Sequence, residues 1–563
     1  MINLTHKIAL AAVTAAVVGA AGIAAAQGQA APAGYKGSPS PPKYERFDHP
    51  QLKHGVLTIE GTKGDDTIVL RLQADRPDVL QVDVGDARKN PFHFRREDVD
   101  SIYLDAGDGN DAVSVDEANG VFTDTIATTL DGGDGNDTLA GGSGAEMLIG
   151  SGGSDSIDGN RGADRAVMGS GDDTFVWDPG DGSDVVEGQD GSDTMVFNGA
   201  AAAEQVDVSA NGSRLRFFRN PGNITMDTAS VETVDFNALG GTDAITVNDL
   251  TGTGVGKVNL DLAGSLGGTT GDAAADRVIV NGTAGNDIVS VSGDAAGVSV
   301  GGLPAQVAMQ HQDPADELVV NGGGGTDSIS AAALAAGSIA LTLDGGSGGD
   351  RIAGGAGVEK SIGGDGNDSI DGNGGADTAL MGSGDDTFVW DPGDGSDVVE
   401  GQDGNDTMVF NGAVAAEQVD VSANGSRLKF FRNPGNITMD TASVETVDFN
   451  ALGGTDTITV NDLTGTGVGK VNLDLAGSLG GLVGDGASDR VIVNGTTGND
   501  AIAVSGDAAG VNVTGLAAAI GIRHAEAAND RLEVNTLAGS DTVSSGGLGG
   551  GLIQLVVDGV LVP

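Results

Sequence analysis

The chain has 563 residues and a formal net charge of −53, from 81 acidic and 28 basic residues. This excess of negative charge disfavours nucleic acid and anionic membranes as partners and favours cations. Hydrophobic residues make up 39% of the chain, which excludes wholesale disorder. With 97 glycines, 3% aromatic residues and no cysteine, the composition favours thin stacked sheets without disulfides over a bulky globular core.

The N-terminal segment, 1–26, carries the pattern of a secretory signal peptide. Lys7 precedes an apolar run over 8–26 that ends in three alanines. A positive residue, an apolar segment and a small-residue cleavage site in this order predict Sec-type export. A membrane anchor is the alternative, because the run could almost span a bilayer. Residues 27–54 are rich in proline and predict an extended linker, and no later segment is predicted to cross a membrane.

Residues 55–130 predict a spacer of short β-strands, after which a nonapeptide repeat begins. From Gly132 the sequence reads GGDGNDTLA, GGSGAEMLI, GSGGSDSID, GNRGADRAV and MGSGDDTFV. Each unit fits G-G-x-G-x-D-x-U-x, where U is a large apolar residue, and this pattern is typical of a calcium-binding parallel β-roll. After an insertion of Trp177-Asp178 the frame resumes, so the first block is predicted over 131–197.

A second block of the same kind begins at Gly345 and is predicted over 344–410. It belongs to a long duplication, in which 168–268 and 381–481 differ at only four positions. β-rich spacers are predicted over 198–343 and 411–563.

In the first of these spacers, hydrophobic alternation over 206–218 surrounds Asn211-Gly212 and predicts a β-hairpin. No sustained helical periodicity follows the signal peptide. The sequence therefore predicts an all-β protein, an elongated parallel β-roll or β-solenoid with two nonapeptide blocks and β-rich spacers.

Each nonapeptide divides into a six-residue loop and a three-residue strand with a buried apolar eighth position. The glycines permit positive φ and a tight backbone path. Two units make one turn of about 18 residues, so loops two units apart should stack on the same edge. Calcium prefers six to eight oxygen ligands at about 2.3–2.6 Å. Loop carbonyls and one aspartate from each of two stacked loops would supply them.

The candidate calcium ligands lie in these loops, mainly at the sixth position. Edge A carries Asp137, Asp155 and Asp173 in the first block, and Asp350, Asp368 and Asp386 in the second. Edge B begins with a glutamate in each block, Glu146 and Glu359, so we expect its sites to be weaker. The predicted metal residues are Gly132, Asp134, Asp137, Asp155, Asp164, Asp173, Asp184, Asp193, Gly345, Asp350, Asp365, Asp368, Asp377, Asp386, Asp397 and Asp406.

Further glycine–aspartate loops occur singly in the spacers. They end at Asp66, Asp111, Asp287, Asp327, Asp500 and Asp541. None of them has a stacked partner at the spacing of two nonapeptides, so ordinary turns and metal sites are both open interpretations. For the blocks, a flexible acidic linker is the alternative, but a linker needs no apolar residue at every ninth position.

Over 131–197 and 344–410 the chain resembles the RTX family, the hemolysin-type calcium-binding repeat proteins. The resemblance implies that the repeats bind Ca²⁺, are disordered where calcium is scarce inside the cell, and fold outside it. The spacer segments FVWDPGDGSDVVEGQ and RFFRNPGNITMD are similar to those of large secreted bacterial calcium-binding proteins without assigned activity. Electrostatics agrees, because stacked carboxylates repel one another and a bound divalent ion supplies folding energy.

No catalytic domain is predicted, since the sequence has neither an H-E-x-x-H zinc motif nor a P-loop. The one cluster of basic and aromatic residues suited to a sugar site, 214–219 with its copy 427–432, is explained by a hairpin strand with one solvated face. We expect a secreted, extracellular or surface-associated calcium-binding structural protein that is not an enzyme. Calcium ions are the expected partners, with cell envelope or polysaccharide as candidates. The alternatives are an adhesin-like module and a lyase- or epimerase-like solenoid enzyme.

Overall fold

The computed structural model describes residues 49–85 and 91–563. The predicted signal peptide and the linker up to residue 48 lie outside the described residues, and β1 (Gln51–Lys53) follows at the end of the predicted linker. The described part of the chain contains 49 β-strands, one 3₁₀ helix, η1 (Arg96–Asp98), and no α-helix. Within these same ranges no helix has the length and apolarity needed to cross a membrane.

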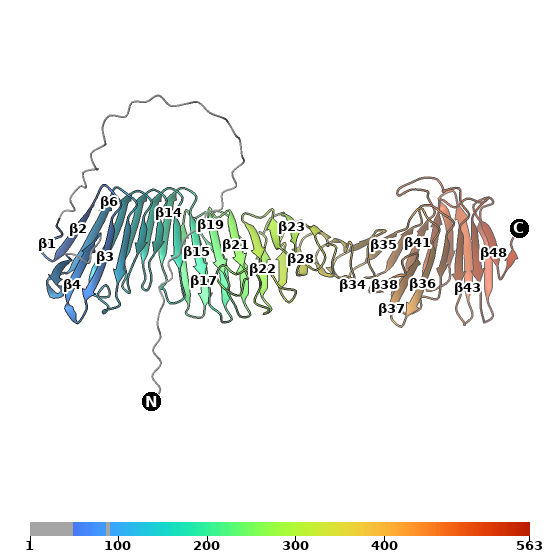
Figure 1. Ribbon diagram of the computed structural model, residues 1–563. Helices are drawn as coiled ribbons and strands as arrows, with labels where there is room; N and C mark the ends of the chain where they lie inside the picture. Colours follow the sequence, from blue (N-terminus) through green and yellow to red (C-terminus); the bar gives the residue numbers. More distant parts are fainter. Residues whose placement is uncertain (1–48, 86–90) are drawn as a thin grey trace, which may run out of the picture. The chain divides into compact units, whose positions relative to one another are not determined.

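Two long sheets, A and B, face each other (Figure 1). Outside the antiparallel insertions, successive strands of the chain belong alternately to sheet A and sheet B. Sheet A consists of β1, β2 (Val56–Thr62), β6 (Ser101–Gly107), β8 (Ala127–Asp134), β10 (Met147–Gly152), β12 (Arg165–Ser170), β14 (Val185–Asp190), β16 (Gln205–Asn211), β17 (Arg214–Asn220), β18 (Ile224–Ala229), β20 (Ala244–Val247), β22 (Arg277–Asn281), β26 (Glu317–Asn321), β28 (Ala340–Ser347), β30 (Glu359–Asp365), β32 (Thr378–Ser383), β34 (Val398–Asp403), β36 (Gln418–Asn424), β37 (Arg427–Asn433), β38 (Ile437–Ala442), β40 (Thr457–Val460), β42 (Arg490–Asn494), β46 (Arg531–Asn535), β48 (Gln554–Val557) and β49 (Val560–Leu561). Sheet B consists of β3 (Thr67–Gln73), β4 (Arg76–Val84), β5 (Phe92–Arg95), β7 (Ala112–Asp116), β9 (Thr138–Ala140), β11 (Ser156–Asp158), β13 (Thr174–Trp177), β15 (Thr194–Asn198), β19 (Thr233–Asn237), β21 (Lys257–Asp261), β23 (Ile288–Asp294), β24 (Gly297–Gly301), β25 (Gln306–Gln310), β27 (Ser328–Leu334), β29 (Arg351–Ala353), β31 (Ser369–Asp371), β33 (Thr387–Trp390), β35 (Thr407–Asn411), β39 (Thr446–Asn450), β41 (Lys470–Asp474), β43 (Ala501–Asp507), β44 (Gly510–Thr514), β45 (Ala519–Arg523) and β47 (Thr542–Leu548).

The strand register in the blocks follows the nonapeptide period. Leu139 pairs with Ile157 and Ile157 with Phe175 in parallel strands of sheet B, so that each step along the sheet spans two nonapeptides. Across the inserted Trp177-Asp178 the step is longer by this dipeptide, because Phe175 pairs with Met195. The predicted parallel β-roll, with two units to a turn, is therefore confirmed.

The spacers continue both parallel ladders and add antiparallel strands. β16 and β17 form the predicted hairpin, in which Asn211 pairs with Arg214, and β18 extends it antiparallel to β17. β16 is parallel to β20 and β18 is parallel to β14, so the inserted strands remain within sheet A. In sheet B, β23, β24 and β25 make a similar antiparallel insertion.

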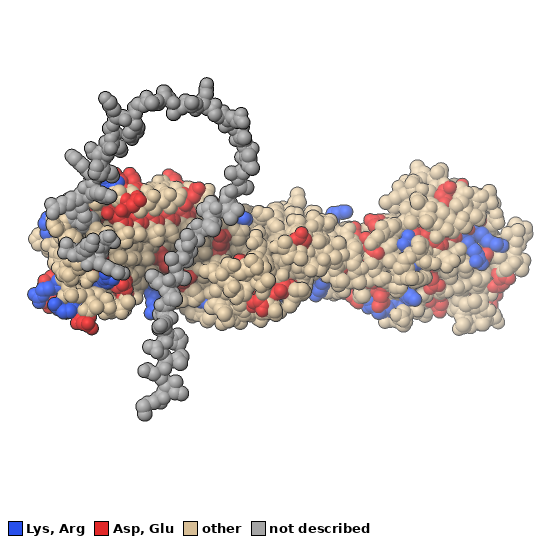
Figure 2. Space-filling model, in the orientation of Figure 1, with Lys and Arg blue, Asp and Glu red and all other residues tan. Residues whose placement is uncertain are grey.

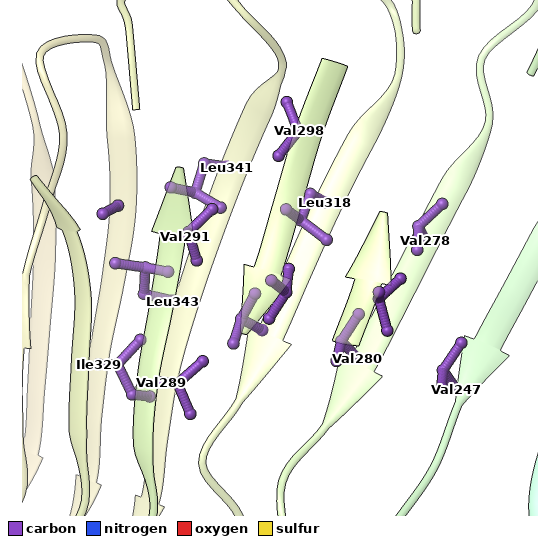
Figure 3. Close-up of a cluster of buried hydrophobic side chains, with 14 of the residues drawn as sticks. Val247, Val278, Val280, Val289, Val291, Val298, Leu318, Ile329, Leu341 and Leu343 are labelled. Atoms are coloured by element: carbon purple, nitrogen blue, oxygen red, sulfur yellow. The ribbon is translucent and has the colours of Figure 1, made fainter. Parts of the chain in front are cut away.

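The core lies between the two sheets and is formed by alternate residues of most strands. Figure 3 shows side chains from both sheets meeting there, among them Val278 and Val280 of sheet A and Val289 and Val291 of sheet B. A cluster of aromatic residues lies next to the inserted dipeptide. Trp177 is 1% exposed and stacks on Phe197 with ring centroids 4.0 Å apart. The tryptophan at the frame break therefore belongs to the core.

Candidate metal centre

The loops of the blocks stack so closely that their glycines are required. In the first block, Leu139, Leu148 and Ile157 occupy the eighth position and are fully buried. Gly153 at the fourth position has a φ of 130°, in the region that favours glycine. A side chain there would overlap the carbonyl oxygen of Gly135 in the preceding turn. The spacing of the glycines thus permits the close stacking of one loop on the next.

The sixth-position aspartates form a ladder along edge A, the edge at which the chain enters sheet B. Asp155 is 3% exposed, and its Oδ1 accepts the backbone N–H of Asp137 at 2.8 Å. The N–H of Asp155 in turn donates to Oδ1 of Asp173 at 2.7 Å. The N–H of Asp173 likewise donates to Oδ1 of Asp193. One oxygen of each carboxylate therefore ties its loop to the loop before it.

The second carboxylate oxygen of these residues is buried and has no hydrogen-bond donor. In the parts of the chain that the structure describes, this holds for Oδ2 of Asp137, Asp155, Asp164, Asp173, Asp184, Asp193, Asp350, Asp368, Asp377, Asp386, Asp397 and Asp406. Leaving such an oxygen unpaired costs on the order of 1–3 kcal/mol, and more where the carboxylate is ionised. A further donor or a cation would remove this cost.

These oxygens face the space left by the first glycine of the loop. A Cβ added to Gly345 would lie 2.6 Å from Oδ2 of Asp350 and 2.6 Å from the carbonyl oxygen of Gly363 in the next turn. A Cβ on Gly363 would lie 2.6 Å from Oδ2 of Asp368. The carboxylate and carbonyl oxygens thus face a common space. Such all-oxygen surroundings fit Ca²⁺.

The raised pKa values of the ladder acids also favour a bound cation. Burial raises the pKa of Asp155 to about 7, and the carboxylates of Asp173 and Asp137 add to this effect. Burial and the neighbouring acids Glu146 and Asp184 raise the pKa of Asp164 to about 8. An opposite charge at the site would relieve both causes, since a cation favours the ionised carboxylate.

Within the described residues, no group of three or more His, Cys, Asp or Glu side chains is placed to hold a metal ion. A cation on this ladder would therefore draw on backbone carbonyls, as the loop chemistry predicts. Backbone and carboxylate oxygens together are a donor set that calcium accepts. The residues present fit this ion.

The structure places most of the predicted ligands on the two ladders. Edge B, where the chain enters sheet A, repeats the arrangement: the N–H of Glu146 donates to Asp164 and that of Asp164 to Asp184. In the second block the corresponding residues are Glu359, Asp377 and Asp397. That the edge B sites are weaker stays a prediction. The Glu146 side chain is longer than that of an aspartate and bends back over its own loop, where it accepts the N–H of Gly142 at 2.8 Å.

The predicted glycines and third-position aspartates lie outside the ladder of hydrogen bonds. Gly132 and Gly345 supply the open space beside Asp137 and Asp350. Asp134 and Asp365, at the third loop position, have exposed side chains and take no part in the ladder of hydrogen bonds. Figure 2 shows acidic side chains in a row over the strands from β6 to β14, so the acidic surface continues outside the ladder.

The ladder extends further than the nonapeptide frame, and this was missed in the sequence. Asp66 donates its N–H to Oδ1 of Asp111, and Asp111 donates to Asp137 at 2.8 Å. Asp327 likewise donates to Asp350 at 2.7 Å. These loops have stacked partners at spacings other than two nonapeptides. The available signal was an acidic residue two positions before a buried apolar residue, as in Asp111 before Val113 and Asp327 before Ile329.

Apart from the loop that ends at Asp541, the single loops divide into two kinds. Oδ2 of Asp111 and of Asp327 is buried without a donor, as in the blocks. In the G-T-x-G-x-D loops a threonine replaces the second glycine and satisfies the acid. Thr283 donates its N–H at 2.8 Å and its hydroxyl at 3.0 Å to Oδ2 of Asp287. Such turns are complete without a metal ion.

The blocks also match a known family. The RTX calcium-binding nonapeptide repeat (4 copies) matches residues 129–145, 140–175, 180–199, 357–388 and 393–412. No curated protein matches the chain. Within the matched segments, the stacked, aspartate-bearing glycine loops of the two blocks are RTX calcium-binding nonapeptide repeats.

Proposed function

We propose that the chain is a secreted calcium-binding structural protein, extracellular or attached to a cell surface, whose two blocks complete their folding when they bind calcium. One observation carries this proposal: the rows of buried carboxylate oxygens that lack donors and face carbonyl oxygens of the next turn. No alternative donor is available to these oxygens within the described part of the chain. A divalent ion would satisfy two turns at once.

Folding coupled to calcium follows from the electrostatics of the blocks. Without a cation, folding brings acids such as Asp155 and Asp164 into buried positions where ionisation is opposed at neutral pH. Binding of an ion that is held by the folded loops and not by the unfolded chain adds its free energy to folding. A chain of this kind would stay loose in a low-calcium compartment and fold in a calcium-rich one.

A role without catalysis is supported by the state of the basic cluster on β17. Arg214 is engaged with Glu187 and Asp227, and Arg216 pairs with Asp207 at 3.1 Å and lies over the Phe218 ring. These contacts occupy the groups that a sugar-binding site would need. The hairpin interpretation therefore accounts for this cluster.

The test is folding of the secreted chain with and without calcium. We expect far-UV circular dichroism to show a large gain of β-structure on adding calcium to chelator-treated protein, and amide exchange over 138–177 to slow sharply. Magnesium at the same concentration is the control, because its small octahedral shell fits these loops poorly. Full exchange protection of the blocks in chelator would refute the proposal.

A further inference from the structure

Outside the blocks, one buried acid of the first spacer has an oxygen that nothing satisfies. Glu204 lies in the turn between β15 and β16 with its side chain 0% exposed. Its Oε1 accepts the Nε–H of Arg219 at 2.6 Å and the N–H of Ala200 at 3.2 Å. Its Oε2 is buried and has no donor among the described residues. The carboxylate is thus half satisfied.

The free oxygen faces two backbone carbonyls. A Cβ added to Gly199 would lie 2.5 Å from Oε2 of Glu204, 2.9 Å from the carbonyl oxygen of Ala238 and 2.9 Å from that of Asn237. Ala238 begins the next turn on edge B, just as Gly363 begins the turn that follows Asp350 in the second block. The same oxygen arrangement therefore occurs with a different sequence.

The next acid on this edge lies in register. The N–H of Glu204 donates to Oδ1 of Asp243 at 2.8 Å, which is the ladder bond of the blocks. Asp243 is 1% exposed, and its Oδ2 also lacks a donor. Two adjacent turns therefore present unpaired carboxylate oxygens.

The second copy of the spacer has the same arrangement. Oε2 of Glu417 is buried without a donor and faces the space of Gly412 at 2.5 Å, with two carbonyl oxygens at 2.9 Å. Glu417 donates its N–H to Asp456, and Arg432 pairs with its other oxygen. The turns read GAAAAE and GAVAAE, without the glycine pattern of the nonapeptide. Both acids also lie beyond the segments matched by the repeat family.

We propose that Glu204 and Glu417 each hold a divalent cation of the calcium class in a spacer turn, with Ala238 and its counterpart Ala451 supplying carbonyl ligands. A hard cation fits, because every group facing the space is an oxygen. Arg219 already balances part of the charge of Glu204, so this ion binds more weakly than those of the blocks and fills its site at higher calcium. The proposal goes beyond the function given above, since neither turn belongs to a block.

The competing explanation is a neutral acid. A protonated Glu204 would donate its own hydrogen to the Ala238 carbonyl and would need no ion. The variant Glu204→Gln combined with Glu417→Gln separates the two, because the amide supplies a hydrogen and removes the charge. If an ion is held, the number of calcium ions bound at saturation falls by two, one per copy. If the acids are neutral, the number is unchanged, and the proposal is overturned.

The matched control removes equal charge from the strand that follows each turn, β16 or β36. Asp207→Asn with Asp420→Asn changes half-exposed acids at the second residue after Gln205 and Gln418, and should leave the ion count unchanged. Ion counts come from equilibrium dialysis of the full secreted chain, with folding checked by circular dichroism. If the Gln variant does not fold, the test is anomalous diffraction from crystals of the unmodified chain that have been soaked in Tb³⁺. An anomalous peak beside Oε2 of Glu204 supports the site, and its absence while the blocks carry peaks overturns it.

A block variant, Asp155→Asn with Asp368→Asn, is measured in parallel. If the number of bound calcium ions falls in this block variant but not in the Glu204→Gln, Glu417→Gln variant, the proposed function stands and only the spacer sites are refuted. No calcium bound by the unmodified chain would remove both.

Discussion

Replacing Asp155 by asparagine should change the stability of its turn in opposite directions with and without calcium. Oδ1 of the new side chain still accepts the N–H of Asp137, which preserves the ladder bond. The amide nitrogen takes the place of Oδ2 beside Gly150 and the Met168 carbonyl oxygen. A donor then meets that carbonyl where an ion would otherwise lie. The turn gains a hydrogen bond and loses a ligand.

The size of the gain follows from the pKa of Asp155. Burial raises this pKa from 3.8 to about 7, so ionisation at pH 8 costs up to about 4 kcal/mol in the ion-free fold, at about 1.36 kcal/mol per pKa unit. Solvent access to the turn reduces this, and we expect a net gain of roughly 2 kcal/mol in chelator. That corresponds to roughly 30-fold slower amide exchange. In calcium at about 100 times the dissociation constant, loss of one ion costs about 2.7 kcal/mol.

Amide hydrogen exchange is the appropriate assay, because a stacked array opens locally and not as one unit. Peptides that cover β11 and β13 should exchange more slowly than the unmodified protein in chelator, and faster in saturating calcium. Asp190→Asn is the control, since this exposed acid carries the same charge. Faster exchange of the Asp155 variant in both conditions would refute the argument that its charge, and not its shape, opposes the ion-free fold.

Three further predictions concern the same turns. The pKa of Asp164 is raised to about 8 and that of Asp184 to about 7, so the protonated acids favour the fold; in chelator, β-structure measured by circular dichroism should be greater at pH 5.5 than at pH 8.5, and saturating calcium should abolish the difference. Gly150→Ala places a methyl group in the oxygen-lined space and should lower the calcium stoichiometry measured by titration calorimetry, whereas an unchanged stoichiometry would mean that the ion lies elsewhere. Thr283→Val removes a hydroxyl bond to Asp287 and should destabilise β23 by about 1 kcal/mol, equally with and without calcium in exchange measurements.

The sequence predicted the architecture of the blocks because two periods coincide there. Apolar residues recur at every ninth position, as in Leu139 and Leu148, and the glycines recur in the same frame, so strands and stacked loops follow together. The hairpin of β16 and β17 was predicted for a similar local reason, since a glycine follows Asn211 within an alternating segment. Local patterns of this kind need no knowledge of distant contacts.

The continuation of the ladder into the spacers could not be predicted from a fixed period. Asp111 lies 26 residues before Asp137, and Asp287 lies 40 residues before Asp327, yet each pair is in register. The extra residues leave the turn as antiparallel strands and loops, such as β23 to β25, and return to the same edge. The number of residues between successive ladder acids therefore varies, whereas each acid still lies one turn from the next along the edge. Only the pairing of the strands reveals which loops are neighbours.

A single physical requirement explains the different turns of this protein. Each ladder aspartate of the blocks is buried and has its first oxygen held by the preceding turn. The second oxygen needs a partner, because burial without one is costly. At Asp287 a threonine meets this need within the loop, whereas at Glu204 an arginine holds the first oxygen and leaves the second without a donor among the described residues. In the blocks, the position equivalent to Thr283 holds glycine or a polar residue that donates elsewhere, as Ser151 donates its hydroxyl to Asp131, so the second oxygen has no donor among the described residues. The regular stacking of the loops and the unpaired oxygens that we propose to bind calcium thus have the same cause.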